Sequence, residues 1–288
     1  MIATAGLLAL LCLAASGLLD LVFKLYTRQK HSIGLLVFGV GSVWFILHGT
    51  YVYATGSVLA FDPLTWRYGL LAAVAVTASN IVLLECLSRM PISTASTIYR
   101  LNTIPLVLLA MLFLGEQLSP VKGAGILVGL VTVLLLYQSA AISEFSRSQS
   151  MRYLALIIMA ACIRALYGIF TKAGIASGAD ANSMMLLASI GWISGGFLYA
   201  GLREKTVQIM PGMMRYIVTA GVLVFAVVWL LTTALTFGDA SVVIPIANMG
   251  FIAAFLFSLV LRLEVLTPRK LLAVLSAVVS IVLLTSTV

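Results

Sequence analysis

The chain is poor in charge. Only 9% of its 288 residues are Asp, Glu, Lys or Arg, whereas soluble domains carry about 25%. In return, 62% of the residues are hydrophobic, against about 45–50% in soluble domains. A soluble fold cannot bury that much apolar surface. The composition therefore excludes a soluble globular domain and predicts an integral membrane protein whose main surrounding is the lipid bilayer.

Cysteine and histidine are also scarce. Cys12, Cys86 and Cys162 all lie in apolar stretches, and their spacing fits neither a disulfide framework nor a zinc site. We therefore expect no metal and no cofactor. The formal net charge is +8, but the basic residues stand singly between apolar stretches and never form a stripe with aromatic residues. Nucleic acid is excluded as a partner on this ground.

Long apolar runs fill most of the chain. A helix needs about 20 apolar residues to cross a hydrocarbon core of ~30 Å, and ten such runs are separated by short connections. The first run has no basic flank of the kind that opens a signal peptide, so it counts as a span. We predict an all-α fold of ten transmembrane helices at 3–24, 33–54, 67–88, 92–113, 121–138, 152–173, 182–201, 214–236, 240–261 and 270–287.

The two halves of the sequence match each other at an offset of 148 residues without a gap. Matches of Leu on Leu are expected by chance in this composition, but matches of rarer residues are not. The matches include Lys24 on Lys172, Trp44 on Trp192, Tyr51 on Tyr199, Pro63 on Pro211 and Arg67 on Arg215. We predict a duplication, with one five-helix repeat at 1–140, a linker at 141–150 and a second repeat at 151–288.

Five spans is an odd number, so the second repeat must enter the membrane in the opposite orientation. Inverted repeats related by a two-fold axis in the membrane plane are a transporter architecture. Two halves with one fold can exchange conformations, which closes one mouth of a central cavity while the other opens. The repeats therefore predict alternating access.

The distribution of Lys and Arg predicts the orientation. Connections 1–2, 3–4, 5–6, 7–8 and 9–10 are basic, and by the positive-inside rule they are cytoplasmic. Both termini are then outside a cell inner (plasma) membrane. The basic set is Lys24, Arg28, Lys30, Arg89, Arg147, Arg152, Arg203, Lys205, Arg215, Arg262, Arg269 and Lys270, against Arg67, Lys122 and Lys172 on the opposite side.

Each half carries the pattern Glu-x-Leu-Ser/Thr-Pro before its last apolar run, at Glu116 to Pro120 and at Glu264 to Pro268. With five spans per half, this resembles the EamA-type branch of the drug/metabolite transporter superfamily over nearly the whole chain. The resemblance implies ten helices around a cavity open to one side, and export of amino acids, other metabolites or drugs. It does not identify the substrate.

The small multidrug resistance proteins, which are distant four-helix relatives, carry a membrane glutamate about two helical turns before a lysine. Counted back from Lys24 and Lys172, that position holds Ser16 and Arg164 here. The carboxylate that would exchange protons for lipophilic cations is therefore missing. One half offers a fixed positive charge instead.

Two arginines lie within predicted spans, Arg164 near the middle of span 6 and Arg100 slightly before the middle of span 4. A charge at the bilayer centre costs at least ~2.5–3.5 kcal/mol, so it normally faces a cavity or a partner. Guanidinium stays protonated and matches carboxylate or phosphate in a bidentate fork. The two arginines predict a site for an anionic or zwitterionic solute.

The acidic residues leave alternatives open. Glu85 lies close enough in depth to pair with Arg100, which would weaken Arg100 as a direct ligand and leave Arg164 as the stronger candidate. Asp20 lies four residues before Lys24, a spacing that favours a local ion pair. Asp20 and Glu85 are also the in-span candidates for proton coupling, and the sequence does not say whether coupling to a proton or a counter-substrate exists.

Further candidates surround the arginines. Pro105 and Pro245 lie within spans 4 and 9. Broken helices near the midplane are where transporters bind substrates, and a packing kink is the alternative role of these prolines. Asn248 occupies the repeat position of Arg100. The remaining predicted substrate-binding residues are Tyr99, Asn102, Ser16, Tyr167 and Trp192.

The leading hypothesis is a secondary transporter that exports a small anionic or zwitterionic metabolite, with an amino acid as first guess. A carrier for phosphate-bearing solutes or lipid-linked sugars is the alternative. A membrane-embedded enzyme needs a cluster of acid/base or metal-binding residues on facing helices, and one in-span histidine with two scattered carboxylates falls short, so we expect no enzyme. The small-residue patterns at 125–129 and 191–195 predict internal packing and leave monomer or dimer open.

Overall fold

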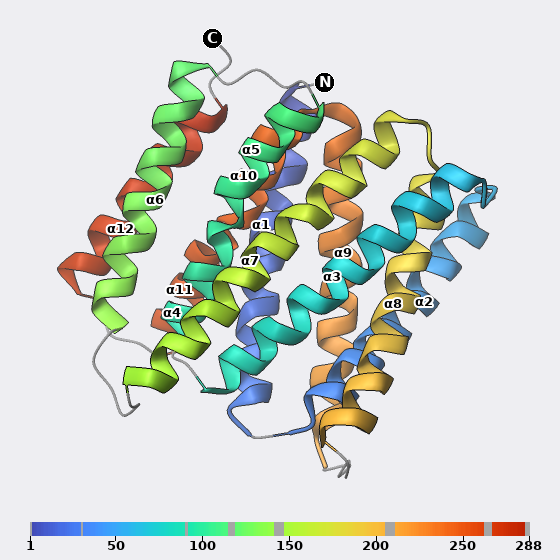
Figure 1. Cartoon of the computed structure of the whole chain (residues 1–288), viewed down its shortest axis with the longest axis horizontal. Helices are drawn as coiled ribbons and strands as arrows, with labels where there is room; N and C mark the ends of the chain where they lie inside the picture. The colour runs from blue at the N-terminus through green and yellow to red at the C-terminus, as the bar shows by residue number, and fades with distance from the viewer. Residues whose placement is uncertain are drawn as a thin grey trace.

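The computed structural model describes residues 2–29, 31–89, 92–114, 119–140, 147–204, 211–261 and 267–285. Every regular element in these ranges is helical (Figure 1). The elements are α1 (Ile2–Thr27), α2 (Ile33–Thr55), α3 (Pro63–Arg89), α4 (Ile92–Tyr99), the 3₁₀ turn η1 (Arg100–Asn102), α5 (Thr103–Leu114), α6 (Pro120–Ala140), α7 (Arg147–Ala176), α8 (Ala181–Tyr199), the π-helical turn η2 (Ala200–Glu204), α9 (Met213–Phe237), α10 (Ala240–Asn248), α11 (Gly250–Val260) and α12 (Pro268–Thr285).

Six helices among the described residues are long and apolar enough to cross a membrane: α1, α2, α3, α7, α8 with its extension η2, and α9. Shorter apolar stretches occur at Thr103–Phe113, Pro120–Thr132, Val242–Phe257 and Leu271–Ser280. The outer faces of the long helices keep large apolar side chains exposed, among them Val74, Phe197 and Ile46. Apolar patches of this extent mark a membrane-facing surface. The predicted class of all-α membrane protein is confirmed at this level.

Two of the apolar stretches are interrupted. α4 and α5 are separated by η1, and α10 and α11 meet at Met249, whose backbone leaves the helical region. Pro105 lies in the first turn of α5, where a residue without an N–H is tolerated. The helix therefore begins anew just before this proline. The first three residues of each Glu-x-Leu-Ser/Thr-Pro pattern, 116–118 and 264–266, lie outside the described residues, as does most of the predicted linker.

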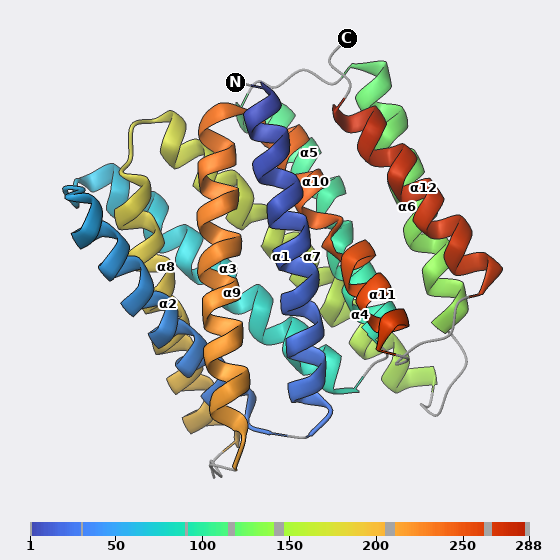
Figure 2. The same ribbon diagram turned by 180° about the vertical axis from the view of Figure 1, so that it is seen from behind.

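The main packing partners come from opposite halves of the sequence. α2 packs on α8, α1 on α9, α3 on α7 and α6 on α12 (Figures 1 and 2). Glycine permits the closest of these approaches: a Cβ on Gly196 of α8 would lie 2.3 Å from the backbone nitrogen of Phe38 on α2. On α3, a Cβ on Gly195 would lie 2.3 Å from Thr77 Cγ2, and one on Gly191 would lie 3.0 Å from Ala73 Cβ. The internal packing predicted for 191–195 is confirmed.

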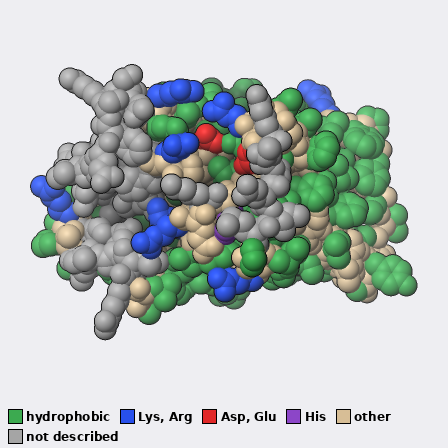
Figure 3. Space-filling model, turned by 90° about the horizontal axis from the view of Figure 1, so that it is seen from below, with side chains coloured by type: hydrophobic (Ala, Val, Ile, Leu, Met, Phe, Trp, Pro, Cys, Tyr) green, Lys and Arg blue, Asp and Glu red, His purple; other side chains and the backbone are tan. Residues whose placement is uncertain are grey.

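The two ends of the bundle differ in charge. Both termini lie at one end, called here the terminal end; α1 runs away from it and α7 runs toward it (Figures 1 and 2). The opposite, basic end carries the exposed side chains of Arg28, Arg89, Arg203 and Arg215, and Figure 3 looks onto this face. At the terminal end, the ammonium of Lys172 turns inward and donates to the carbonyls of Leu235 and Gly238, 2.9 Å each, at the end of α9.

Local capping fixes where α3 begins. The carboxylate of Asp62 accepts hydrogen bonds from the backbone N–H groups of Leu64 and Thr65, at 2.8 and 3.0 Å, and from the Thr65 hydroxyl at 2.8 Å. These bonds favour the charged carboxylate and hold the pKa of Asp62 below its usual value. Asp62 therefore acts as the N-cap of α3.

Candidate functional site

A buried ion pair joins α1 to the interruption between α4 and α5. Arg100 Nη2 lies 2.5 Å from Asp20 Oδ2, and the two side chains are only 9% and 7% exposed. The partner of Arg100 is thus Asp20 and not Glu85, which corrects the pairing considered from depth alone. The Asp20 carboxylate therefore reaches across from α1 to η1. Taking both charges out of water demands such a close contact.

Glu85 lies elsewhere, on the side of α3 that faces α8 and η2. It accepts a hydrogen bond from the Tyr199 hydroxyl and lies 4.0 Å from Arg203 Nη2. Nearby, the carboxylate of Glu204 in η2 accepts from the hydroxyl of Ser32 and from the N–H groups that open α2. These two carboxylates tie α8 to α3 and α2 near the basic end. In the described part of the chain, the contacts of Glu85 are therefore with Tyr199 and Arg203 and not with Arg100 or Arg164.

Arg164 of α7 contacts an aromatic ring. Its Cζ lies 4.7 Å from the ring centre of Tyr167, a cation–π contact. Among the described residues, no ion pair joins Arg164 to a carboxylate. Ser16 on α1 lies one turn after Cys12, with its hydroxyl 4.0 Å from that sulfur. The helix α7, which carries Arg164, contacts η1, which begins at Arg100.

The two helix interruptions meet through asparagines. The Asn248 amide donates to Oδ1 of Asn102, and both side chains are almost fully buried. Asn102 Nδ2 and Arg100 Nε, both buried, have no hydrogen-bond partner among the described residues. Buried donors are normally satisfied by protein, water or ligand. The interruption therefore offers two N–H groups to a bound molecule beside the ion pair.

Two more predicted residues contact this region. The Tyr99 hydroxyl donates to Ser79 of α3 at 3.3 Å. Ser16 lies against Gly250 at the start of α11, so close that a Cβ on Gly250 would come within 2.7 Å of the Ser16 Cβ. We call the set Ser16, Asp20, Tyr99, Arg100, Asn102, Arg164, Tyr167 and Asn248 the central polar cluster. It is built from α1, α4 with η1, α7 and α10.

Trp192 is placed differently. Its ring makes an edge contact with Trp44 of α2, with centroids 6.3 Å apart, and Gly41 of α2 also abuts it. Both indoles are nearly fully buried. The described contacts of Trp192 thus belong to the packing of α2 on α8.

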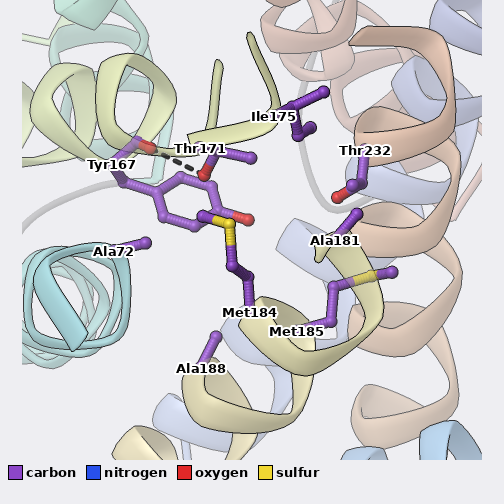
Figure 4. A pocket seen from close by; sticks show the side chains of 9 residues that line it. All are labelled: Ala72, Tyr167, Thr171, Ile175, Ala181, Met184, Met185, Ala188 and Thr232. Atoms are coloured by element: carbon purple, nitrogen blue, oxygen red, sulfur yellow. Dashed lines mark hydrogen bonds between the residues drawn. The ribbon is translucent and has the colours of Figure 1, made fainter. Parts of the chain in front are cut away.

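A small pocket opens beside the central polar cluster (Figure 4). Its free volume is about 10 Å³, room for a single water molecule. The Thr171 hydroxyl donates to the Tyr167 carbonyl at 2.8 Å, and the hydroxyl of Thr232, whose side chain is 3% exposed, has no partner among the described residues. The lining is Ala72, Tyr167, Thr171, Ile175, Ala181, Met184, Met185, Ala188 and Thr232. Except for Tyr167, sequence reasoning did not single out these residues.

No family model and no curated protein sequence matches the chain. One solved structure, described as "Crystal structure of protein", is similar with a TM-score of 0.78 and 17% sequence identity. The alignment covers 97% of this chain and 94% of that chain. At this identity the likeness concerns the fold, which a solved protein shares almost from end to end.

Proposed function

We propose that the protein is a secondary transporter that exports a small anionic or zwitterionic metabolite, an amino acid in the first instance, by alternating access. The observation that carries the proposal is the position of Arg164. It is half-buried in the central polar cluster, and it lacks a carboxylate partner among the described residues. A permanent cation in that setting suits a substrate carboxylate.

The helix bounds support a duplication. Shifting the first half by 148 residues carries α3 onto α9, α4 onto α10 and α5 onto α11, with ends that agree within about two residues. The interruption at 100–102 falls on 248–250. Counting α4 with α5 and α10 with α11 as single spans gives ten in all. The opposite directions of α1 and α7 suit an inverted second half.

The packing supports an exchange of conformations between the halves. Under the same shift the pair α1–α9 becomes α7–α3, while α2–α8 and α6–α12 map onto themselves. A two-fold arrangement of this kind lets the bundle close at one end as it opens at the other. The exposed arginines of the basic end fit a cytoplasmic face, which leaves the termini outside a cell inner (plasma) membrane.

Asp20 supplies a means of coupling. Its carboxylate lies 2.5 Å from the guanidinium of Arg100, and a substrate carboxylate would compete with it for the N–H donors of that guanidinium. A proton on Asp20 would weaken the pair and release Arg100 toward the substrate. Proton binding and substrate binding are linked in this way without contact between them.

The test is flux through proteoliposomes that contain the purified protein. Arg164→Gln removes the charge while keeping a polar side chain of similar length, and we expect at least a tenfold loss of amino-acid counterflow. Arg152→Gln on the same helix, where Arg152 is exposed, is the matched control and should transport normally. Phosphate esters in the solute panel test the alternative carrier class. Normal flux through a well-folded Arg164→Gln protein would overturn the assignment.

A further inference from the structure

The pocket beside the central polar cluster shares a residue with it. The ring of Tyr167 makes a cation–π contact with the Arg164 guanidinium. Tyr167 also lines the pocket, and its hydroxyl end points into it (Figure 4). From there the lining follows α7 through Thr171 and Ile175 toward the terminal end. A molecule held at Arg164 therefore has the pocket directly next to its anionic group.

The 148-residue register pairs three lining positions of the pocket with larger apolar residues of the other half. When the two halves are aligned at an offset of 148 positions, Thr171 aligns with Phe23, Thr232 with Leu84 and Met184 with Leu36. Phe23 is 1% exposed, and Leu84 and Leu36 are fully buried. At these three positions one half has large, buried apolar side chains where the other has two hydroxyls and a flexible thioether, whereas Tyr167 and Ile175 pair with the smaller Leu19 and Thr27.

The residues that line the pocket indicate which chemical group would fit it. It is mainly apolar, with three alanines, Ile175 and two methionines, and it offers the unpartnered hydroxyl of Thr232. Binding sites for small molecules combine an apolar wall with a few polar groups in this way. Methionine side chains have several rotatable bonds and repack around different shapes, so Met184 and Met185 can widen a space whose present volume would suit one water molecule.

We propose that this pocket receives the side chain of the substrate while Arg164 holds its carboxylate. The substrate class is then a neutral amino acid with an unbranched apolar or thioether side chain of moderate length. This inference rests on the proposed function, which supplies the carboxylate at Arg164.

Binding of a homologous series to the purified full-length protein tests the inference. Alanine, norvaline, norleucine and methionine share the same ammonium and carboxylate groups and differ in their side chains, and a thermal-shift titration gives their apparent affinities. Each buried methylene adds a factor of about four in affinity. Norleucine, with three more methylenes than alanine, should therefore bind up to ~60-fold more tightly.

Two substitutions place the repeat-related residues of the other half, Phe23 and Leu84, at the corresponding pocket positions: Thr171→Phe and Thr232→Leu. Each should remove most of the gain of norleucine over alanine and leave the affinity for alanine within about twofold. Met184→Ala widens the pocket and should shift the preference toward longer side chains. Leu166→Phe, on an outward position of α7, is the control and should leave the series unchanged.

The outcomes separate the two proposals. If the wild type binds the series without regard to side-chain length, or if Thr232→Leu and Met184→Ala both fold and leave the preference unchanged, the pocket assignment is wrong and the transporter assignment stands. If no member of the series stabilises the wild type and Arg164→Gln transports normally, the proposed function fails and the pocket assignment with it. Thr171→Phe is the most disruptive variant, and the other two decide the question without it.

Discussion

Replacing Asp20 by Asn tests the buried ion pair most directly. The substitution keeps the size of the side chain but leaves the Arg100 charge without its carboxylate, and the two side chains are only 7% and 9% exposed. Removing one partner of a buried pair costs about 3–5 kcal/mol. Because the Asn Oδ1 can still accept one hydrogen bond, we expect a loss of about 3 kcal/mol, at the lower end of that range.

Thermal unfolding in detergent, followed by intrinsic tryptophan fluorescence, measures the effect. A loss of this size lowers Tm by roughly 5–10 °C in a chain of this length. The double variant Asp20→Asn/Arg100→Gln removes both charges and should regain much of the loss, because the two sites interact and their effects do not add. Asp239→Asn is the control, since Asp239 is 63% exposed and lies 4.0 Å from Lys122; such a surface pair is worth less than about 1 kcal/mol.

Two results would refute the reasoning. A Tm for Asp20→Asn that equals that of Asp239→Asn would mean that the pair contributes no more than a surface contact. A double variant whose loss equals the sum of the single losses would mean that the two groups do not interact.

Further predictions concern helix packing and capping. Gly196→Ala should destabilise the protein by about 1–3 kcal/mol, because its Cβ would meet the backbone of Phe38 at 2.3 Å. Gly201→Ala, whose Cβ would meet nothing within 4 Å, is the control in the same unfolding assay, and equal effects would contradict the close approach. The lowered pKa of Asp62 means that its folded pKa lies below the unfolded one, so its stabilisation is present above the unfolded pKa and is lost as pH falls through the folded pKa. The stability difference between wild type and Asp62→Asn should therefore shrink between about pH 5 and pH 2, and a difference independent of pH would exclude the charged cap.

The sequence predicts the helices well because apolar length is a local property. The predicted spans at 33–54, 67–88 and 214–236 correspond closely to α2, α3 and α9. The prolines located the interruptions only coarsely, because the first break at 100–102 precedes Pro105, and Pro245 lies inside α10 while the second break falls at Met249. Which helices then lie side by side is not a local property.

The pairing of charges shows the limit of this reasoning. Depth along the hairpin suggested Glu85 as the partner of Arg100. The contact between Asp20 and Arg100 spans 80 positions in sequence and depends on α1 lying beside η1. Likewise, the match of Trp44 on Trp192 did not reveal that the two rings touch each other.

Two of the pocket residues could have been found from the sequence. Thr171 and Thr232 look ordinary in isolation, but the 148-residue register aligns them with Phe23 and Leu84. Listing the positions where the register replaces a large apolar residue by a small or polar one would have included these two threonines. The burial of the pocket and its proximity to Arg164 still required the structure.

The crossed packing of the helices has a consequence for how the chain holds together. α1, α2, α3 and α6 each find their main partner beyond residue 147, so neither half covers its own apolar faces. In its contacts, the protein thus resembles two intertwined subunits joined in one polypeptide. Such a covalent link raises the local concentration of one half around the other. Contacts between the halves therefore stabilise the fold, and we expect two separately synthesised halves to associate in the membrane.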